Sequence, residues 1–462
     1  RELTVASSAT YAPFAFENKD KQIVGFDIDI INAIAKHQNL KIKIVNIINE
    51  PVTVTKAVAS CGCTIPTWPK EPIPVGGSAD AEITLKPPEK QGLDLHKRVT
   101  FQLDGHAPVV LDLKGHVAEF IKIVPEMMRL GSWRSVYSTA ARYVKDERLR
   151  IALSFHPLFI GGNPFTVTSI YCMITYFERN WGVHFAVGGT GRLIQGMASL
   201  LEGMGGQVRC GAQVSAITVD EAARRVTGVR LASGEQLQAD IVVSNADVAH
   251  TYRTLLPASV RRRWTDRRIE RARYSMSLFV WYFGTRRQYP DLAHHTIVMG
   301  PRYRELLEDI FDKKVLAEDF SLYLHRPSAS DPTVAPPGCD TFYVLSPVPN
   351  LATQSIDWRE RAEPYRARIA AALSSSLLPG FEKEIVTSKI VTPLHFQDAL
   401  LSYQGAAFSL EPVLTQSAWF RPHNRSEDVE GLYLVGAGTH PGAGLPGVLS
   451  SARVLDGIVP AA

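Results

Sequence analysis

The hydrophobic and polar positions of the chain follow regular periods near its N-terminus, lose them over a proline-rich stretch and regain them further on. Apolar residues at helical spacing predict a helix over residues 27–37, and alternating residues predict a strand over 41–45. Strand-like segments at 3–6 and 23–26 precede this helix. The order is typical of an α/β unit, so we expect residues 1–49 to form a βαβ segment.

Residues 50–112 contain many prolines, which interrupt long helices and strands. Only the short runs 99–103 and 109–113 have strand-like patterns, and together they predict a hairpin. We therefore expect this segment to be an irregular junction between two folded parts of the chain.

From residue 113 onward, helix and strand patterns alternate to the C-terminus. Helical spacing predicts helices over residues 117–130, 133–144, 168–179 and 192–202. Short apolar or alternating runs predict strands over residues 207–210, 214–219, 226–231, 241–244, 277–283, 295–299, 321–325 and 341–348. This mixture predicts an α/β fold with an inserted antiparallel sheet and its helices.

The composition is that of an ordinary globular protein, with 45% hydrophobic and 21% charged residues among 462. A net charge of +4 is too small to imply a nucleic-acid partner. The five cysteines have neither the spacing of a zinc site nor that of a disulfide framework, which fits a reducing cytoplasm. No apolar run is long enough to span a bilayer, so any membrane contact is expected to be peripheral.

Seven arginines gather between Arg261 and Arg273, around Trp264. The ordinary interpretation, which we favour, is a solvated helix face. The alternative is a patch that meets anionic lipid headgroups with Trp264 as its anchor.

The last apolar run, residues 432–435, leads into a loop dense in glycine and then into a helix over 450–458. Such a loop lets the backbone approach a flat anionic cofactor closely. A Gly-x-Gly-x-x-Gly motif, the usual partner of such a loop, follows no early strand. The sequence therefore contains one half of a flavin site.

From about residue 119 to its C-terminus, the chain resembles the bacterial phytoene (carotenoid) desaturases of the FAD-dependent amine-oxidase-like superfamily. The segments that carry the resemblance are residues 133–137, 154–156, 161–165, 188–191, 195–197, 244–247, 293–296, 300–304, 317–325, 411–424 and the terminal glycine loop. The resemblance implies a flavin-binding Rossmann-like domain, incomplete at its N-terminus, with an inserted α+β substrate domain. Its flavin-domain parts lie near residues 186–250 and 426–462, and its substrate-domain parts near 113–185 and 251–425.

This resemblance also implies an activity, the FAD-dependent desaturation of phytoene toward neurosporene or lycopene in carotenoid biosynthesis. FAD binding is expected to be weakened, because the glycine triplet is missing. The substrate is a hydrophobic carotenoid taken from a bilayer, which implies a cytoplasmic protein attached peripherally to the inner membrane. No nucleic-acid partner is expected, and the sequence leaves the oligomeric state open.

The resemblance places the cofactor contacts mainly on backbone N–H groups. These contacts are Gly436, Gly438, Thr439, Gly447 and Val448 in the terminal loop and helix, with the backbone of Val214 toward the adenine. A plain strand-to-helix turn is the alternative for the loop.

Glu119 and Lys122 lie three residues apart on a predicted helix and so share a face. The resemblance implies that Lys122 stabilises developing charge and that Glu119 relays a proton. A surface ion pair is the more common meaning of such a pair.

His294, His295 and His325 could form a metal set, but no carboxylate cluster accompanies them at ligand spacing. We expect polar core or tunnel-mouth residues and no metal.

The first 49 residues resemble the opening of periplasmic amino-acid-binding proteins, through residues 6–14 and 24–29. The chain is therefore interpreted as a chimera. The alternative function is a remnant of such a binding protein fused to a non-catalytic desaturase-like domain.

Overall fold

The computed structural model describes residues 131–353 and 355–460, together with strands and short links before residue 116. Those earlier residues are 10–11, 15–17, 23–24, 39–45, 53–59, 64–67, 70–74, 78–85, 95–103 and 106–115. The chain divides into two compact units, one of residues 1–133 with 456–462 and one of residues 134–455.

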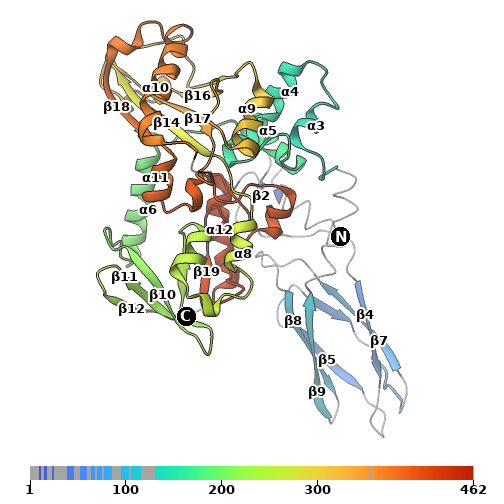
Figure 1. The fold of residues 1–462 in the computed structure, drawn as a ribbon. Coiled ribbons are helices and arrows are strands. Elements are labelled where there is room, and N and C mark those ends of the chain that lie inside the picture. Colours follow the sequence, from blue (N-terminus) through green and yellow to red (C-terminus); the bar gives the residue numbers. More distant parts are fainter. Residues whose placement is uncertain are drawn as a thin grey trace. The chain divides into compact units, whose positions relative to one another are not determined.

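The first unit contains two antiparallel three-stranded sheets (Figure 1). One has the order β4-β7-β6, with strands Asn39–Val45, Ser78–Leu85 and Thr64–Thr67. The other has the order β5-β8-β9, with strands Val54–Ala59, Leu95–Leu103 and His106–Gly115. A further small sheet joins β1 (Thr10–Tyr11), β2 (Ala15–Glu17) and β3 (Ile23–Val24).

These sheets differ from two expectations. Strands β5 to β9 cover much of the segment expected to be an irregular junction, and β4, expected to end a βαβ unit, pairs antiparallel with β7. Pro66 and Pro108 lie on the edge strands β6 and β9, which are the strands of a sheet that tolerate proline. The expected hairpin is confirmed as β8 and β9. The helices expected over 27–37 and 117–130 lie outside the described residues.

A five-stranded antiparallel sheet of order β15-β16-β17-β14-β18 organises part of the second unit. Its strands are His295–Val298, Leu322–His325, Asp340–Val348, Ser277–Thr285 and Ile385–Val391. Strand β14 is apolar on both faces, and its side chains alternate between two cores. Phe279, Trp281 and Phe283 pack with α10 (Trp358–Ser374), whereas Leu278 and Val280 pack with α9 (Tyr303–Glu308).

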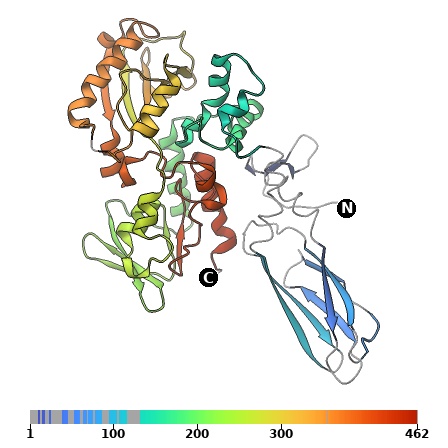
Figure 2. The same ribbon diagram turned by 45° about the vertical axis from the view of Figure 1, so that its right-hand side comes forward.

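A second group of elements surrounds the C-terminal strand. Strands β10 (Val214–Asp220), β11 (Arg225–Leu231) and β12 (Gln236–Gln238) form an antiparallel meander. Strand β13 (Val242–Ser244) pairs in parallel with β19 (Leu432–Leu434). Helix α12 (Leu445–Ile458), coloured red in Figure 2, follows β19. The remaining α-helices of the second unit are α3 (Val136–Ala140), α4 (Glu147–Ser154), α5 (Met173–Trp181), α6 (Thr190–Gly203), α7 (Val248–His250), α8 (Asp266–Arg271) and α11 (Pro393–Asp398).

The predicted mixture of helices and sheets is confirmed, while the Rossmann-like character and the insertion stay predictions. The strand expected over 207–210 is wrong. Gly205 and Gly211 have positive φ values on either side of it and turn the chain there. Among the described residues, no helix combines the length and the apolar composition needed to cross a bilayer.

Candidate functional site

The loop between β19 and α12 is closed by a serine of the helix. The backbone N–H of Gly436 donates to Ser451 Oγ at 2.8 Å, and that hydroxyl donates to the carbonyl of Val448 at 2.5 Å. Because β19 is completely buried beside β13, the start of the loop is fixed in position. The predicted residues at the two ends of the loop are thereby brought together.

The predicted glycines are packed so closely against the protein that a side chain would collide with its neighbours. A Cβ at Gly436 would lie 2.7 Å from Asn245 Oδ1, and one at Gly438 would lie 2.7 Å from Ser409 Oγ. A Cβ at Gly447 would lie 2.6 Å from the Gly442 carbonyl oxygen. Gly436 also has a φ of 106°, which disfavours other residues. Close packing of the loop against the protein therefore requires glycine at these positions, and their contact with a cofactor stays a prediction.

Two other predicted contacts use their donors inside the protein. The N–H and the hydroxyl of Thr439 both point to the carbonyl of Gly436, at 3.2 and 2.9 Å. The N–H of Val448 donates to the Gly444 carbonyl at 2.9 Å, inside the first turn of α12. Both residues shape the loop, and their contact with a cofactor stays a prediction.

Arg421 was missed from the sequence, although it lies inside a segment that carries the resemblance. Its side chain is only 1% exposed, and burial lowers its pKa. Nη1 donates to the Ala437 carbonyl at 2.7 Å and Nη2 to the Leu410 carbonyl at 2.9 Å. Nε has no partner among the described residues, and a Cβ at Gly442 would lie 3.3 Å from it. The buried guanidinium of Arg421 thus lies beside the glycine loop.

His440 supplies a second unpartnered nitrogen in the same loop. Its Nδ1 is buried without a partner among the described residues, and burial lowers its pKa. Its carbonyl is held at 3.0 Å by the Asn424 amide, which also reaches the carbonyls of Leu434 and Ser451. Buried polar atoms without partners are uncommon in folded proteins, so these two nitrogens fit a site that binds a polar ligand.

A buried acid lies next to Leu410 in the chain. Glu411 is 2% exposed and accepts from Arg273 Nε at 2.8 Å and from Thr166 Oγ1 at 3.2 Å. Burial raises the pKa of Glu411, and the guanidinium of Arg273 opposes this rise. Only its place in a segment that carries the resemblance marks Glu411 in the sequence.

The predicted adenine contact lies in the antiparallel meander. Val214 begins β10 and pairs with Leu231, and the contact of its backbone with an adenine stays a prediction. Asp247, after β13, accepts from the N–H groups of Ala249 and His250 and so caps α7. Glu119 and Lys122 lie outside the described residues.

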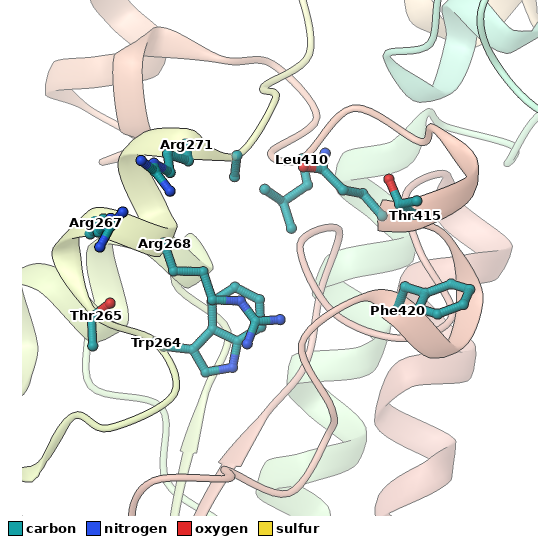
Figure 3. A pocket seen from close by; sticks show the side chains of 10 residues that line it. Trp264, Thr265, Arg267, Arg268, Arg271, Leu410, Thr415 and Phe420 are labelled. Carbon is teal, nitrogen blue, oxygen red and sulfur yellow. The ribbon is translucent and has the colours of Figure 1, made fainter. Parts of the chain in front are cut away.

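The arginine stretch lines a cavity of about 410 Å³ (Figure 3). The interpretation of Trp264 as a membrane anchor is wrong, because the indole is 4% exposed and its Nε1 donates to Glu427 at 2.9 Å. The Arg268 guanidinium lies 3.9 Å from the centre of the Trp264 ring. The cavity is lined by Trp264, Thr265, Arg267, Arg268, Arg271, Ala272, Leu410, Thr415, Gln416 and Phe420.

The three histidines come together at the edge of the five-stranded sheet. His294 Nε2 and His325 Nε2 are 2.7 Å apart, and the side chain of His295 lies beside them. Burial lowers the pKa of all three, that of His325 to about 3, so the imidazoles are neutral at pH 7.

Two families match separate parts of the chain. The family described as flavin containing amine oxidoreductase matches residues 119–454. A family described as a protein of unknown function (DUF1573) matches residues 24–117, across both the expected βαβ segment and the expected junction.

Several carotenoid enzymes are similar to the chain. A phytoene desaturase (neurosporene-forming) of Cereibacter sphaeroides is 55% identical over 346 residues, which cover 74% of this chain and 66% of that protein. A phytoene desaturase (lycopene-forming) of Pantoea ananas is 49% identical over 344 residues, 74% of this chain and 69% of that protein. The chain thus spans about two thirds of the length of these relatives.

Among solved structures, an oxidoreductase from Methanosarcina mazei has a similar fold. Its TM-score is 0.51 at 15% identity, with 76% of each chain covered.

Proposed function

Because the chain belongs to the flavin containing amine oxidoreductase family, we propose that it is a flavin-dependent oxidoreductase that desaturates a carotenoid such as phytoene toward neurosporene or lycopene. The observation that carries this proposal is the identity of 49–55% to phytoene desaturases over 74% of the chain. Desaturation removes two hydrogens from neighbouring saturated carbons. Since no ordinary side chain accepts a hydride, FAD is the group that supplies this chemistry.

The terminal loop and α12 are proposed to hold the FAD. Gly436, Gly438 and Gly447 let the loop pack closely behind the cofactor, and the N-terminus of α12 offers the positive end of a helix dipole. Arg421 Nε and His440 Nδ1 supply buried nitrogens that lack partners among the described residues. These donors are preorganised, so they can stabilise negative charge without rearrangement.

The experiment that tests this proposal is reconstitution of the purified full chain with FAD, followed by incubation with liposomes that contain phytoene. We expect flavin absorbance to co-purify with the chain and longer polyenes to form. A chain that takes up no flavin and converts no phytoene would overturn the proposal. Gly438→Val should reduce flavin uptake, because its side chain would meet Ser409, whereas Gly203→Ala adds a Cβ in open space and serves as the control.

Glu119 and Lys122 remain proposed as proton relay and charge stabiliser. Glu119→Gln and Lys122→Met should each lower turnover while flavin uptake is kept. Unchanged turnover in both variants would remove these residues from the chemistry.

The proposed membrane contact rests on the exposed arginines of the stretch. Arg262, Arg267 and Arg271 are exposed and make no recorded ion pair with the described residues, in contrast to Arg261 and Arg263. Each such cation near an anionic surface is worth about 1 kcal/mol. We expect the full chain to sediment with vesicles of phosphatidylglycerol more than with phosphatidylcholine, and equal sedimentation would contradict membrane binding through these charges.

A further inference from the structure

The histidine cluster is built by the pairing of two strands. In the register of β15 and β16, His295 lies directly opposite His325, and His294 immediately precedes β15. Their rings are close, with centroids of His294 and His325 4.6 Å apart and those of His294 and His295 4.3 Å apart. One ligand atom from each of the three side chains lies within 4.8 Å of the other two. Strand geometry, not chain proximity, therefore gathers three imidazoles at one point.

Neighbouring side chains fix which nitrogen of two rings is available. Ser330 Oγ lies 2.7 Å from His294 Nδ1, and Tyr323 Oη lies 2.6 Å from His295 Nδ1. Both rings are thus held at Nδ1, which leaves Nε2 as the ligating atom. Metal-bound histidines usually have their other nitrogen held in this way.

His325 is the buried member of the cluster, at 6% exposure. Its Nδ1 is buried with no partner among the described residues, while its Nε2 faces that of His294 at 2.7 Å. A buried polar ring that is satisfied only by another histidine has an incomplete set of partners. A cation bound between the rings would give each of them a stronger interaction.

We propose that His294, His295 and His325 form a Zn²⁺ site, with a fourth position left open to water. Imidazole nitrogen suits zinc, and three protein ligands with one open position are a common zinc arrangement. At Zn–N distances of about 2.0–2.1 Å, tetrahedral ligand nitrogens are roughly 3.4 Å apart. The 2.7 Å between His294 Nε2 and His325 Nε2 is about 0.7 Å shorter than this value, and a ligand atom of His295 lies within 4.8 Å of the other two rings.

Three imidazoles can bind zinc without a carboxylate ligand. The lack of a carboxylate cluster, on which the expectation of no metal rested, therefore does not exclude this site. His294 and His295 are less buried than His325, so small ring movements on the exposed side could close the coordination sphere. Strand β15 is at the edge of its sheet, so a bound ion would join this edge strand to β16. Zinc is therefore expected to stabilise the protein as well as bind to it.

The test uses the full chain without an affinity tag, in a Cys61→Ser/Cys63→Ser background that removes the two closely spaced thiols. After removal of metal with a chelator, ZnCl₂ is titrated by calorimetry, and bound metal is measured by mass spectrometry. We expect one ion per chain and a higher Tm with zinc. The double variant His294→Gln/His295→Gln should lose both effects, whereas His395→Gln, an exposed histidine outside the cluster, should keep them.

Tyr323→Phe provides a second variant that leaves all three ligands in place. Loss of its contact with His295 should weaken zinc binding by about 10- to 100-fold without abolishing it. The proposal is overturned if the Cys61→Ser/Cys63→Ser chain with all three histidines binds no zinc. It is also overturned if His294→Gln/His295→Gln binds zinc with undiminished affinity while its circular dichroism spectrum stays native.

Discussion

Arg421 donates from Nη1 to the carbonyl oxygen of Ala437, 2.7 Å away, inside the protein. Its other terminal nitrogen donates to the carbonyl of Leu410, so one buried guanidinium joins two segments that are distant in the chain. The Ala437 carbonyl belongs to the glycine loop between β19 and α12. The shape of that loop therefore depends on a side chain outside it.

We expect Arg421→Lys to lower the free energy of unfolding by about 2–4 kcal/mol, because an ammonium cannot reach both carbonyls and one buried acceptor loses its donor. Urea denaturation measures this loss. Arg361→Lys, on the exposed face of α10, is the matched control and should change stability by less than about 0.5 kcal/mol. Equal stability of the two variants would contradict the bridging role.

Arg421 was missed because the sequence does not reveal a buried cation. An arginine between Phe420 and Pro422 has the pattern of an ordinary surface residue, and only contacts with Leu410 and Ala437 show that it is enclosed. By contrast, the glycine loop could be predicted, since glycine density after a buried strand has a local meaning. The predictable part of the site is its backbone, and the unpredictable part is its side-chain donors.

The same distinction applies to the fold. Strand β14 could be predicted from its continuous apolar run, and α6 from its helical spacing. The strands of the first unit were harder to predict, because Pro66 is acceptable only on an edge strand, and edges are not visible in a sequence. His295 and His325 meet only through the register of two strands, which is a tertiary property.

A second prediction concerns Glu411 and its partner. In Arg273→Met, the buried carboxylate loses its guanidinium, and we expect the unfolding free energy at pH 7 to fall by about 1–3 kcal/mol. The double variant Arg273→Met/Glu411→Gln should recover part of this loss, because no unpaired charge is then buried. Chemical denaturation of the two single variants and the double variant completes the cycle, and strictly additive losses would contradict the coupling.

The pH dependence of Arg273→Met has a definite sign. Burial raises the pKa of Glu411 in the folded state, and losing Arg273 raises it further. Because the unfolded carboxyl ionises first, near pH 4.3, stability falls as the pH rises from about 4.3 to the folded pKa. The unfolding free energy of Arg273→Met should therefore differ least from that of the wild type below this pH window. A difference in unfolding free energy that stays constant from pH 4 to 8 would contradict the mechanism.

A third prediction concerns Asp428, which holds the backbone at the start of the arginine stretch. Its carboxylate accepts the backbone N–H groups of Arg262, Arg263 and Trp264 at 3.0, 2.7 and 2.9 Å. Asp428→Ala leaves these donors without their acceptor and should cost about 2–4 kcal/mol of unfolding free energy in thermal or urea denaturation. Asp398→Ala, an exposed residue at the end of α11, is the control. A loss no greater than that of the control would show that water replaces the carboxylate.

The last prediction separates a stabilising role of Trp264 from a membrane-binding role of the exposed arginines. Trp264 is buried against Tyr252, with its Nε1 bound to Glu427, so Trp264→Phe should lower the unfolding free energy by about 1–2 kcal/mol and leave vesicle binding unchanged. Arg267→Gln/Arg271→Gln should reduce vesicle binding and leave the unfolding free energy unchanged. Both side chains are exposed at the cavity and make no ion pair with the described residues, so they contribute charge but little stability. Sedimentation with phosphatidylglycerol vesicles and urea denaturation of both variants measure the two effects. Arg359→Gln/Arg361→Gln, an equal loss of charge on α10, should change neither. If Arg267→Gln/Arg271→Gln binds these vesicles as well as the wild type does, the exposed arginines are not the membrane contact.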